Sequence, residues 1–192
     1  MHTQTAPVPT AFSGNIPRYY DSGLGPLFFE PFSKHLGARI AERSPDAVLE
    51  LACGTGRLTR RMMEGLPAGA RVVATDVNPA MLQFAQQAIA DPRIEWGVVD
   101  AVELPYPDAH FDLVVVQFGV MFYTDRTKAY RQALRVLRPG GRLLFTCWNA
   151  LEANPVAKLT QDVVKHFFPV DTPAFYTIPF AYHDRAVIRE EV

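Results

Sequence analysis

The sequence predicts a doubly wound α/β fold, in which a mostly parallel sheet carries helices on both faces. Short apolar runs alternate with helix-like segments from residue 47 onward, an order typical of parallel strands joined by right-handed crossovers. One of these runs, Phe111–Gln117, is apolar along almost its whole length, as a strand buried on both faces should be. A glycine-bearing turn, Gly54-Thr55-Gly56, separates the first apolar run from a helix-like segment.

The chain is expected to open with a flexible tail and a helical lid. Residues 1–16 are rich in Pro, Thr and Ser, which favours a tail and leaves residues 17–192 as one domain. The segment Leu24–Arg43 has helical apolar spacing that is interrupted by Pro26 and Pro31. We therefore expect a capping helix, or a pair of helices, before the sheet begins.

Strands and helices are then expected to alternate. The predicted strands are Ala47–Leu51, Arg71–Thr75, Ile94–Val99, Phe111–Gln117 and Arg142–Trp148. Three predicted helices are Arg57–Gly65, Thr124–Leu137 and Pro155–Phe168. A fourth is capped by Asn78 and runs to about Ala90, and a fifth starts near Asp184. The tripeptide Pro139-Gly140-Gly141 is expected to be a turn between a helix and a strand.

The composition fits one globular domain. Of the 192 residues, 48% are hydrophobic and 20% are charged, and the formal net charge is -1. No Lys/Arg run of the kind that follows phosphates is present, which disfavours nucleic acid as a partner, and no apolar stretch is long enough to predict a membrane span. Cys53 and Cys147 lie far apart and have no zinc-site spacing. We therefore expect no metal site and a reduced, cytoplasmic protein.

Three acidic residues are expected at the carboxyl ends of the first three strands, where ligands of such sheets bind. They are Glu50, Asp76 and Asp100. Asp76 lies 20 residues beyond Gly56, where a carboxylate can accept hydrogen bonds from both ribose hydroxyls of a bound nucleoside. Asp76 alone does not distinguish NAD from an adenosyl cofactor.

Glu50 and Asp100 favour a cationic cofactor without phosphate. An acidic rim would repel the pyrophosphate of NAD, and Thr59 stands where a dinucleotide fingerprint has its third glycine. S-adenosylmethionine carries an ammonium that Glu50 can attract and an adenine amino group that can donate to Asp100. Gly54 and Gly56 would let the backbone approach the methionyl portion closely. An NAD(P)-dependent oxidoreductase and a non-catalytic cofactor-binding module remain the alternatives.

Four segments resemble successive motifs of the class I S-adenosylmethionine-dependent methyltransferases, in particular the small-molecule group with the ubiquinone/menaquinone-type domain. The segments are "VLELACGTGRLTR", "VVATDVNPAMLQFA", "VVDAVELPYPDAHFDLVVVQFGVMFY" and "ALRVLRPGGRLLFTCW". The resemblance implies a Rossmann-like fold with an N-terminal helical lid and S-adenosylmethionine as the cofactor. It implies cofactor contacts at Glu50, Ala52, Gly54, Gly56, Asp76, Val77, Asp100, Ala101 and Val102. It also places Met81 near the adenine, Gln117 beside the methionyl group and Tyr20 of the lid within reach of the cofactor.

The expected reaction is methyl transfer by in-line displacement to a small-molecule acceptor that is partly apolar. The sequence Gln117-Phe118-Gly119-Val120 follows the fourth strand in place of the motif that amino-directed nucleic-acid methyltransferases carry there. No residue can be assigned as a general base. Four apolar or aromatic residues follow the fourth strand and either line an apolar acceptor pocket or belong to the core: Phe118, Met121, Phe122 and Tyr123.

The resemblance implies a sheet of seven strands, but the sequence predicts only five. No run after Trp148 has the alternation needed for two further strands. We therefore expect the fifth strand, Arg142–Trp148, to form an open sheet edge. Either residues beyond Val192 would complete the domain, or a second subunit would cover that edge in a homodimer.

Overall fold

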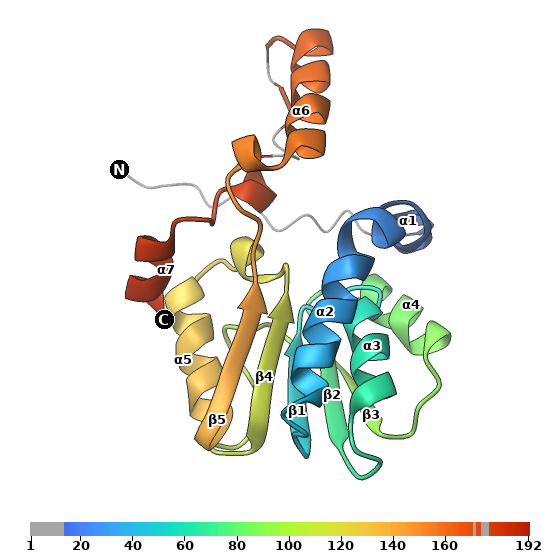
Figure 1. Cartoon of the computed structure of the whole chain (residues 1–192), viewed down its shortest axis with the longest axis vertical. Helices are drawn as coiled ribbons and strands as arrows, with labels where there is room; N and C mark the ends of the chain where they lie inside the picture. The colour runs from blue at the N-terminus through green and yellow to red at the C-terminus, as the bar shows by residue number, and fades with distance from the viewer. Residues whose placement is uncertain (1–13, 171, 174–176) are drawn as a thin grey trace.

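The computed structural model describes residues 14–170, 172–173 and 177–192, and residues 1–13 of the expected tail lie outside this part of the chain. Its centre is a five-stranded sheet in the order β3-β2-β1-β4-β5, and every pair of neighbouring strands is parallel (Figure 1). The strands are β1 (Ala47–Leu51), β2 (Arg71–Asp76), β3 (Ile94–Val98), β4 (Phe111–Gln117) and β5 (Leu137–Thr146). This arrangement confirms the doubly wound α/β prediction.

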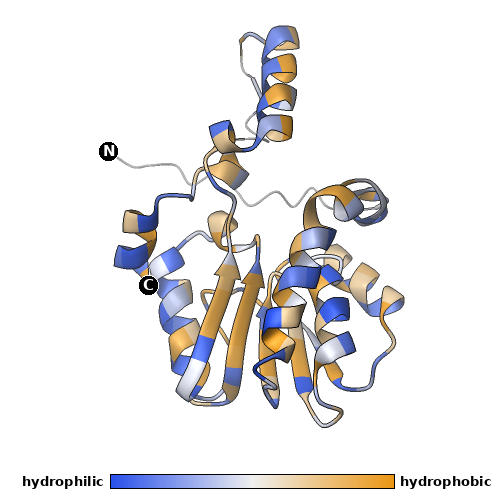
Figure 2. Ribbon diagram, viewed as in Figure 1, coloured by the Kyte–Doolittle hydropathy of each residue, from blue (hydrophilic) through white to orange (hydrophobic). Residues whose placement is uncertain are grey.

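Helices cover both faces of the sheet, as predicted. On one face, α2 (Glu30–Ala41), α3 (Arg57–Gly65) and α4 (Pro79–Ala88) pack through Leu36, Met62 and Leu82. On the other face, α5 (Arg126–Val136) packs through Tyr130 and Val136. Successive side chains of β1 alternate between the two cores, as the pleat of a strand requires, and Figure 2 shows the strands as the most apolar part of the molecule.

The last strand corrects the sequence prediction. β5 begins at Leu137, so Pro139-Gly140-Gly141 lies within the strand instead of forming a turn before it. Leu137 pairs with Phe111 and Arg142 pairs with Leu113, so the residues between them form a bulge. Gly140 permits the bulge because its φ is +82°. The strand also ends at Thr146, two residues before the predicted end.

The N-terminal lid differs from the prediction in where its helices begin. Helix α1 (Ile16–Tyr19) continues into η1, a π-helix over Tyr20–Phe29, and then into α2. The helical segment therefore starts at Ile16 and not at Leu24. Pro26 lies inside the π-helix, and Pro31 lies in the first turn of α2, where its missing N–H costs no helical hydrogen bond.

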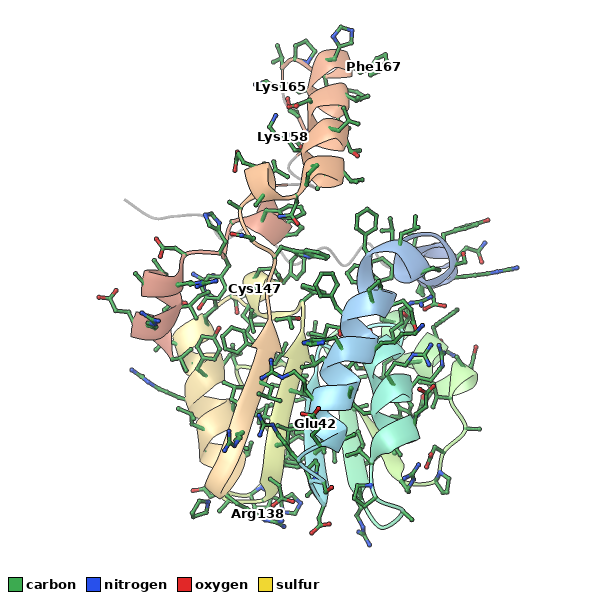
Figure 3. All side chains as sticks on the ribbon, viewed as in Figure 1. Glu42, Arg138, Cys147, Lys158, Lys165 and Phe167 are labelled. Carbon is green, nitrogen blue, oxygen red and sulfur yellow. The ribbon has the colours of Figure 1, made fainter. Side chains whose placement is uncertain are left out.

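The segment after β5 leads away from the sheet and then returns to it. It contains η3 (Leu151–Ala153), α6 (Pro155–Phe167), η5 (Ile178–Phe180) and α7 (Arg185–Glu191). Helix α6, with Lys158, Lys165 and Phe167, projects beyond the carboxyl ends of the strands (Figures 1 and 3). Helix α7 returns to α5 through an ion pair between Arg126 and Glu191 at 2.8 Å. Within the described ranges the sheet has five strands, as predicted, and β5 is one of its two edges. None of the described helices is long and apolar enough to cross a membrane.

Candidate functional site

The glycine turn after β1 has three residues in the left-handed region of backbone conformation. Ala52, Gly54 and Gly56 have φ values of +54°, +57° and +79°. A Cβ on Gly54 would meet no atom within 4 Å, so this backbone is open to a ligand. Gly56 has different surroundings, because a Cβ there would lie 2.7 Å from Ile89 and 3.1 Å from Ala85. Gly56 therefore lets the turn pack against α4 and the residue after it.

Glu50 is held inside the protein, below the glycine turn. Its side chain is fully buried and accepts a hydrogen bond of 2.5 Å from the hydroxyl of Thr59 on α3. Burial raises the pKa of Glu50 to about 8, against the opposing effect of the Thr59 hydrogen bond and with a further contribution from Asp76. Thr59, which stands where a dinucleotide fingerprint has its third glycine, thus holds the carboxyl group of Glu50 in place. Its place in the sequence did not indicate this role.

Asp76, at the end of β2, connects two loops of the site. One carboxylate oxygen accepts from the Gly54 amide at 2.8 Å, and the other accepts from the Asn78 amide at 2.8 Å. Burial raises the pKa of Asp76, while these backbone hydrogen bonds lower it. Each oxygen of a carboxylate has a second acceptor position, so Asp76 can still receive ligand hydroxyls.

The predicted nucleoside residues surround Asp76 and the end of β3. Asn78 caps α4 by accepting from the amides of Ala80 and Met81, as the sequence predicted. Met81 is buried, and Val77 is 50% exposed. Beyond β3, Asp100 is exposed and accepts from the Val102 amide at 3.1 Å, and Ala101 between them is buried. These residues provide carboxylates and apolar side chains along one side of the rim.

Gln117 ends β4 and connects the sheet with the lid. Its side-chain amide donates to the Ser33 hydroxyl at 2.8 Å, and Ser33 in turn donates to the carbonyl of Phe29 at 2.9 Å. The side-chain oxygen of Gln117 is buried and accepts no hydrogen bond from any described residue. An unsatisfied acceptor of this kind favours a ligand with a donor group.

The lid is fixed to the glycine turn by ion pairs. Asp21 accepts from the Thr55 hydroxyl at 2.9 Å and pairs with Arg57 at 3.0 Å. Arg57 also pairs with Glu30 at 3.0 Å. Tyr20 stacks on Phe29 with ring centroids 5.2 Å apart, and burial together with the Asp76 charge raises its pKa. The predicted lid residue Tyr20 is thus packed within the lid, whereas the Asp21–Arg57 connection was not predicted.

Five aromatic side chains gather beside Gln117, and we call them the aromatic cluster: Phe29, Phe32, Phe118, Trp148 and Phe180. Phe118 and Trp148 stack in parallel, with ring centroids 4.0 Å apart. Phe32 meets both of these rings edge-on, at 5.0 and 5.4 Å. Phe118 has a φ of +53°, a strained conformation for a bulky residue that is most often found at functional sites.

One hollow of the surface lies at the opposite end of the sheet. It has a volume of about 430 Å³, is open to solvent, and is bordered by residues such as Glu42, Asp112 and Arg142. Ligands of parallel α/β sheets bind at the carboxyl ends of the strands, so we assign no function to this hollow. In Figure 3, Glu42 and Arg138 mark this end of the molecule and Cys147 marks the opposite, carboxyl end.

The fold and the site define an α/β domain with an acidic, glycine-containing cofactor rim beneath a helical lid. This is the architecture of a class I S-adenosylmethionine-dependent methyltransferase. The chain belongs to the methyltransferase domain family, whose model matches residues 49–145. The matched region runs from β1 to β5 and so contains the predicted site residues other than Tyr20 of the lid.

Relatives that are similar in sequence to this chain are also methyltransferases. The chain is 36% identical over 131 residues to the Ubiquinone/menaquinone biosynthesis C-methyltransferase UbiE of Proteus mirabilis, an alignment that covers 66% of this chain and 52% of the relative. It is 38% identical over 120 residues to the protein of the same name from Pseudomonas aeruginosa, covering 60% of this chain and 47% of the relative. The chain thus spans about half the length of the curated relatives it matches.

Solved structures share the fold. A Methanococcus maripaludis protein assigned to the S-adenosylmethionine-dependent methyltransferases superposes with a TM-score of 0.65, covering 87% of this chain and 84% of that one at 20% identity. A Haloferax volcanii protein, solved in complex with the Trm112 methyltransferase activator, gives a TM-score of 0.65 at 19% identity, covering 91% of this chain and 73% of that one.

Proposed function

We propose that this chain binds S-adenosylmethionine at the acidic rim and transfers its methyl group to a small-molecule acceptor. The observation that carries the proposal is the match between the polar groups of the site and a cationic nucleoside. Glu50, Asp76 and the unsatisfied oxygen of Gln117 are acceptors, and the open backbone at Gly54 leaves room beside them. The pyrophosphate of NAD would instead lie against the carboxyl groups of Glu50 and Asp76, which disfavours NAD as the cofactor.

Each part of the cofactor has a residue of suitable chemistry. The methionyl ammonium would lie near Glu50 and donate to the free oxygen of Gln117, which Ser33 holds in place. The ribose hydroxyls would donate to Asp76, and the adenine amino group would donate to Asp100. The bound cofactor supplies an activated methyl group on a sulfonium. The contribution of the protein is therefore mainly proximity and orientation, worth about 7–11 kcal/mol of the barrier in well-oriented systems.

The acceptor is proposed to be small and partly apolar, with a carbon atom as the methylated position. The matched relatives are named C-methyltransferases, which supports transfer to carbon. The aromatic cluster supports an apolar acceptor because Phe118 and Trp148, which stack on each other, lie just beyond the ends of β4 and β5, on the methionyl side of the rim. Phe32 is 42% exposed, so the cluster is accessible from outside.

Two proposals concern the surroundings of the enzyme. The open edge of β5 supports a homodimer formed through that strand, which sedimentation of the purified chain would test. Cys53 and Cys147 are both free thiols, which supports a reducing, cytoplasmic compartment.

Calorimetric titration with S-adenosylmethionine, S-adenosylhomocysteine and NADH tests the proposed function. We expect both sulfur compounds to bind in the low-micromolar to millimolar range and NADH not to bind. Binding of NADH without binding of the sulfur compounds would replace the proposal with an NAD-dependent oxidoreductase. Cofactor binding without methyl transfer to any apolar acceptor would favour a non-catalytic binding module.

A further inference from the structure

The phenolic hydroxyl of Tyr123 is a buried polar group that the proposed cofactor contacts leave unused. Tyr123 directly follows η2 (Val120–Phe122), the short helix after β4, and its ring packs against the core on the α5 face of the sheet. The hydroxyl oxygen is shielded from solvent and has no hydrogen-bond partner among residues 14–170, 172–173 and 177–192. Buried tyrosine hydroxyls usually have a partner, so this one suggests a ligand that would supply it.

The hydroxyl lies where the loops after β1 and β4 meet. It is 4.0 Å from the position that a Cβ on Gly119 would occupy, and this same position is 2.6 Å from the Cβ of Ala52. Ala52 belongs to the glycine turn after β1, and Gly119 lies just beyond Gln117, the last residue of β4. The glycine turn and Gln117 are the parts of the site that we assign to the methionyl portion of the cofactor. A methionyl group bound there can therefore come close to the Tyr123 hydroxyl.

The methionyl carboxylate is the one anionic group of the cofactor, and no residue has yet been assigned to it. A carboxylate only accepts hydrogen bonds, so its partner must be a donor. Some backbone amides of the glycine turn are already engaged. Those of Cys53, Gly54 and Gly56 donate within the protein, at 2.9, 2.8 and 2.9 Å. These three amides therefore cannot hold the carboxylate.

Side-chain donors around the turn are engaged as well. The hydroxyls of Thr55 and Thr59 donate to carboxylates of the protein, and the side-chain amide of Gln117 donates to a serine hydroxyl. The Tyr123 hydroxyl, in contrast, is a donor without a partner among the described residues. Burial raises its pKa, and nearby ionisable groups raise it further, so the phenol keeps its proton at neutral pH and can donate it to a hydrogen bond.

We propose that Tyr123 positions the methionyl portion of the cofactor by donating its hydroxyl hydrogen to the methionyl carboxylate. This inference rests on the proposed function and extends it to the amino-acid part of the cofactor. The ammonium and the carboxylate are attached to the same carbon atom, so an ammonium held at Gln117 brings the carboxylate to the adjoining loop, which leads to Tyr123. The acidic residues of the rim repel a carboxylate, so this group requires a donor of its own. The bound carboxylate in turn supplies the partner that the hydroxyl lacks.

The test compares wild-type protein with Tyr123→Phe by calorimetric titration. The ligands are S-adenosylhomocysteine and decarboxylated S-adenosylhomocysteine, in which a hydrogen atom replaces the carboxylate; if the second compound binds weakly, its affinity is measured by competition with the first. We expect Tyr123→Phe to bind S-adenosylhomocysteine about 10- to 100-fold more weakly, the loss typical of one hydrogen bond to a charged group. The decarboxylated compound should bind to the wild type and to the variant with equal affinity.

A matched variant separates binding from folding. Tyr130→Phe also removes a phenolic hydroxyl, but that hydroxyl is bonded to Tyr182 at 3.1 Å. We expect Tyr130→Phe to lower the melting temperature and leave the affinity for both ligands unchanged. Tyr123→Phe should show the opposite pattern, with an unchanged or higher melting temperature of the free protein, because it removes a hydroxyl that has no partner among the described residues.

The possible outcomes distinguish this inference from the proposed function. A loss of affinity that is confined to the ligand with the carboxylate would support the inference. If wild type and Tyr123→Phe bind S-adenosylhomocysteine equally well, the role of Tyr123 is wrong and the proposed function stands. If the variant loses the same affinity for both ligands, the hydroxyl contacts another part of the cofactor and the inference is wrong. If the wild type does not bind S-adenosylhomocysteine, the proposed function itself fails, and this inference fails with it.

Discussion

Replacing Glu50 by glutamine tests whether this carboxyl group is kept neutral inside the fold. Burial raises its pKa from 4.5 to about 8. Because the pKa is higher in the folded state, the contribution of Glu50 to stability is greatest below pH 4.5 and is lost as the pH rises to about 8. Glutamine has nearly the same shape, can accept the hydrogen bond from Thr59, and does not ionise.

The expected effect is large. A carboxyl group whose pKa is higher in the folded than in the unfolded state lowers the stability by about 1.36 kcal/mol for each pH unit by which the pH rises between these two pKa values. Between pH 4.5 and pH 7 the wild type should therefore lose about 3 kcal/mol that Glu50→Gln does not lose. For a domain of this size, this free energy corresponds to about 6–12 °C in melting temperature.

The assay is thermal unfolding of both proteins without cofactor at several pH values from 4.5 to 8. The difference in melting temperature isolates Glu50, because the other acidic groups, Asp76 included, are present in both proteins. We expect the variant to gain stability relative to the wild type steadily as the pH rises. Parallel curves across this range would refute the reasoning, because they would show that Glu50 ionises as readily in the folded protein as in the unfolded chain.

Three further predictions concern the cofactor and the lid. The affinity for S-adenosylhomocysteine should rise from pH 6 to pH 8 in the wild type but not in Glu50→Gln, because the ligand ammonium favours ionised Glu50; titrations at three pH values would test this. Asp76→Asn should weaken binding by about 1.5–3 kcal/mol, and a folded variant with wild-type affinity would show that the ribose lies elsewhere. Arg57→Ala should speed hydrogen exchange in residues 16–29, because it removes the ion pairs to Asp21 and Glu30; unchanged exchange there would mean that packing alone holds the lid.

The sheet was the part of the fold that local sequence pattern predicted best. The bounds of β1 and β4 match the prediction because their apolar runs are set apart from their neighbours by polar residues and glycine turns. The start of β5 does not match the prediction. Pro139-Gly140-Gly141 has the composition of a turn, but pairing with β4 begins before it, at Leu137, and resumes after a bulge. A bulge depends on the neighbouring strand, which no local pattern contains.

The carboxylates of the site could be predicted, but their partners could not. Glu50 and Asp76 follow from the rule that ligands bind at strand ends. The bond between Gln117 and Ser33 joins residues 84 positions apart, and that between Asp21 and Thr55 joins residues 34 positions apart. Such contacts arise from the docking of the lid on the finished sheet. The sequence between the partners gives no signal for them.

The packing of the lid on Arg57 restricts which sequences can adopt this arrangement. Gly25 is buried in the π-helix, and a Cβ there would lie 2.1 Å from the Arg57 guanidinium, which Asp21 and Glu30 hold in place. A methyl group at position 25 therefore cannot coexist with the arginine in this position. Across homologues we expect positions 25 and 57 to change together, so that a larger residue at 25 accompanies a shorter or uncharged one at 57. A designer who wished to graft this lid onto another methyltransferase domain would have to transfer the glycine and the arginine as a pair.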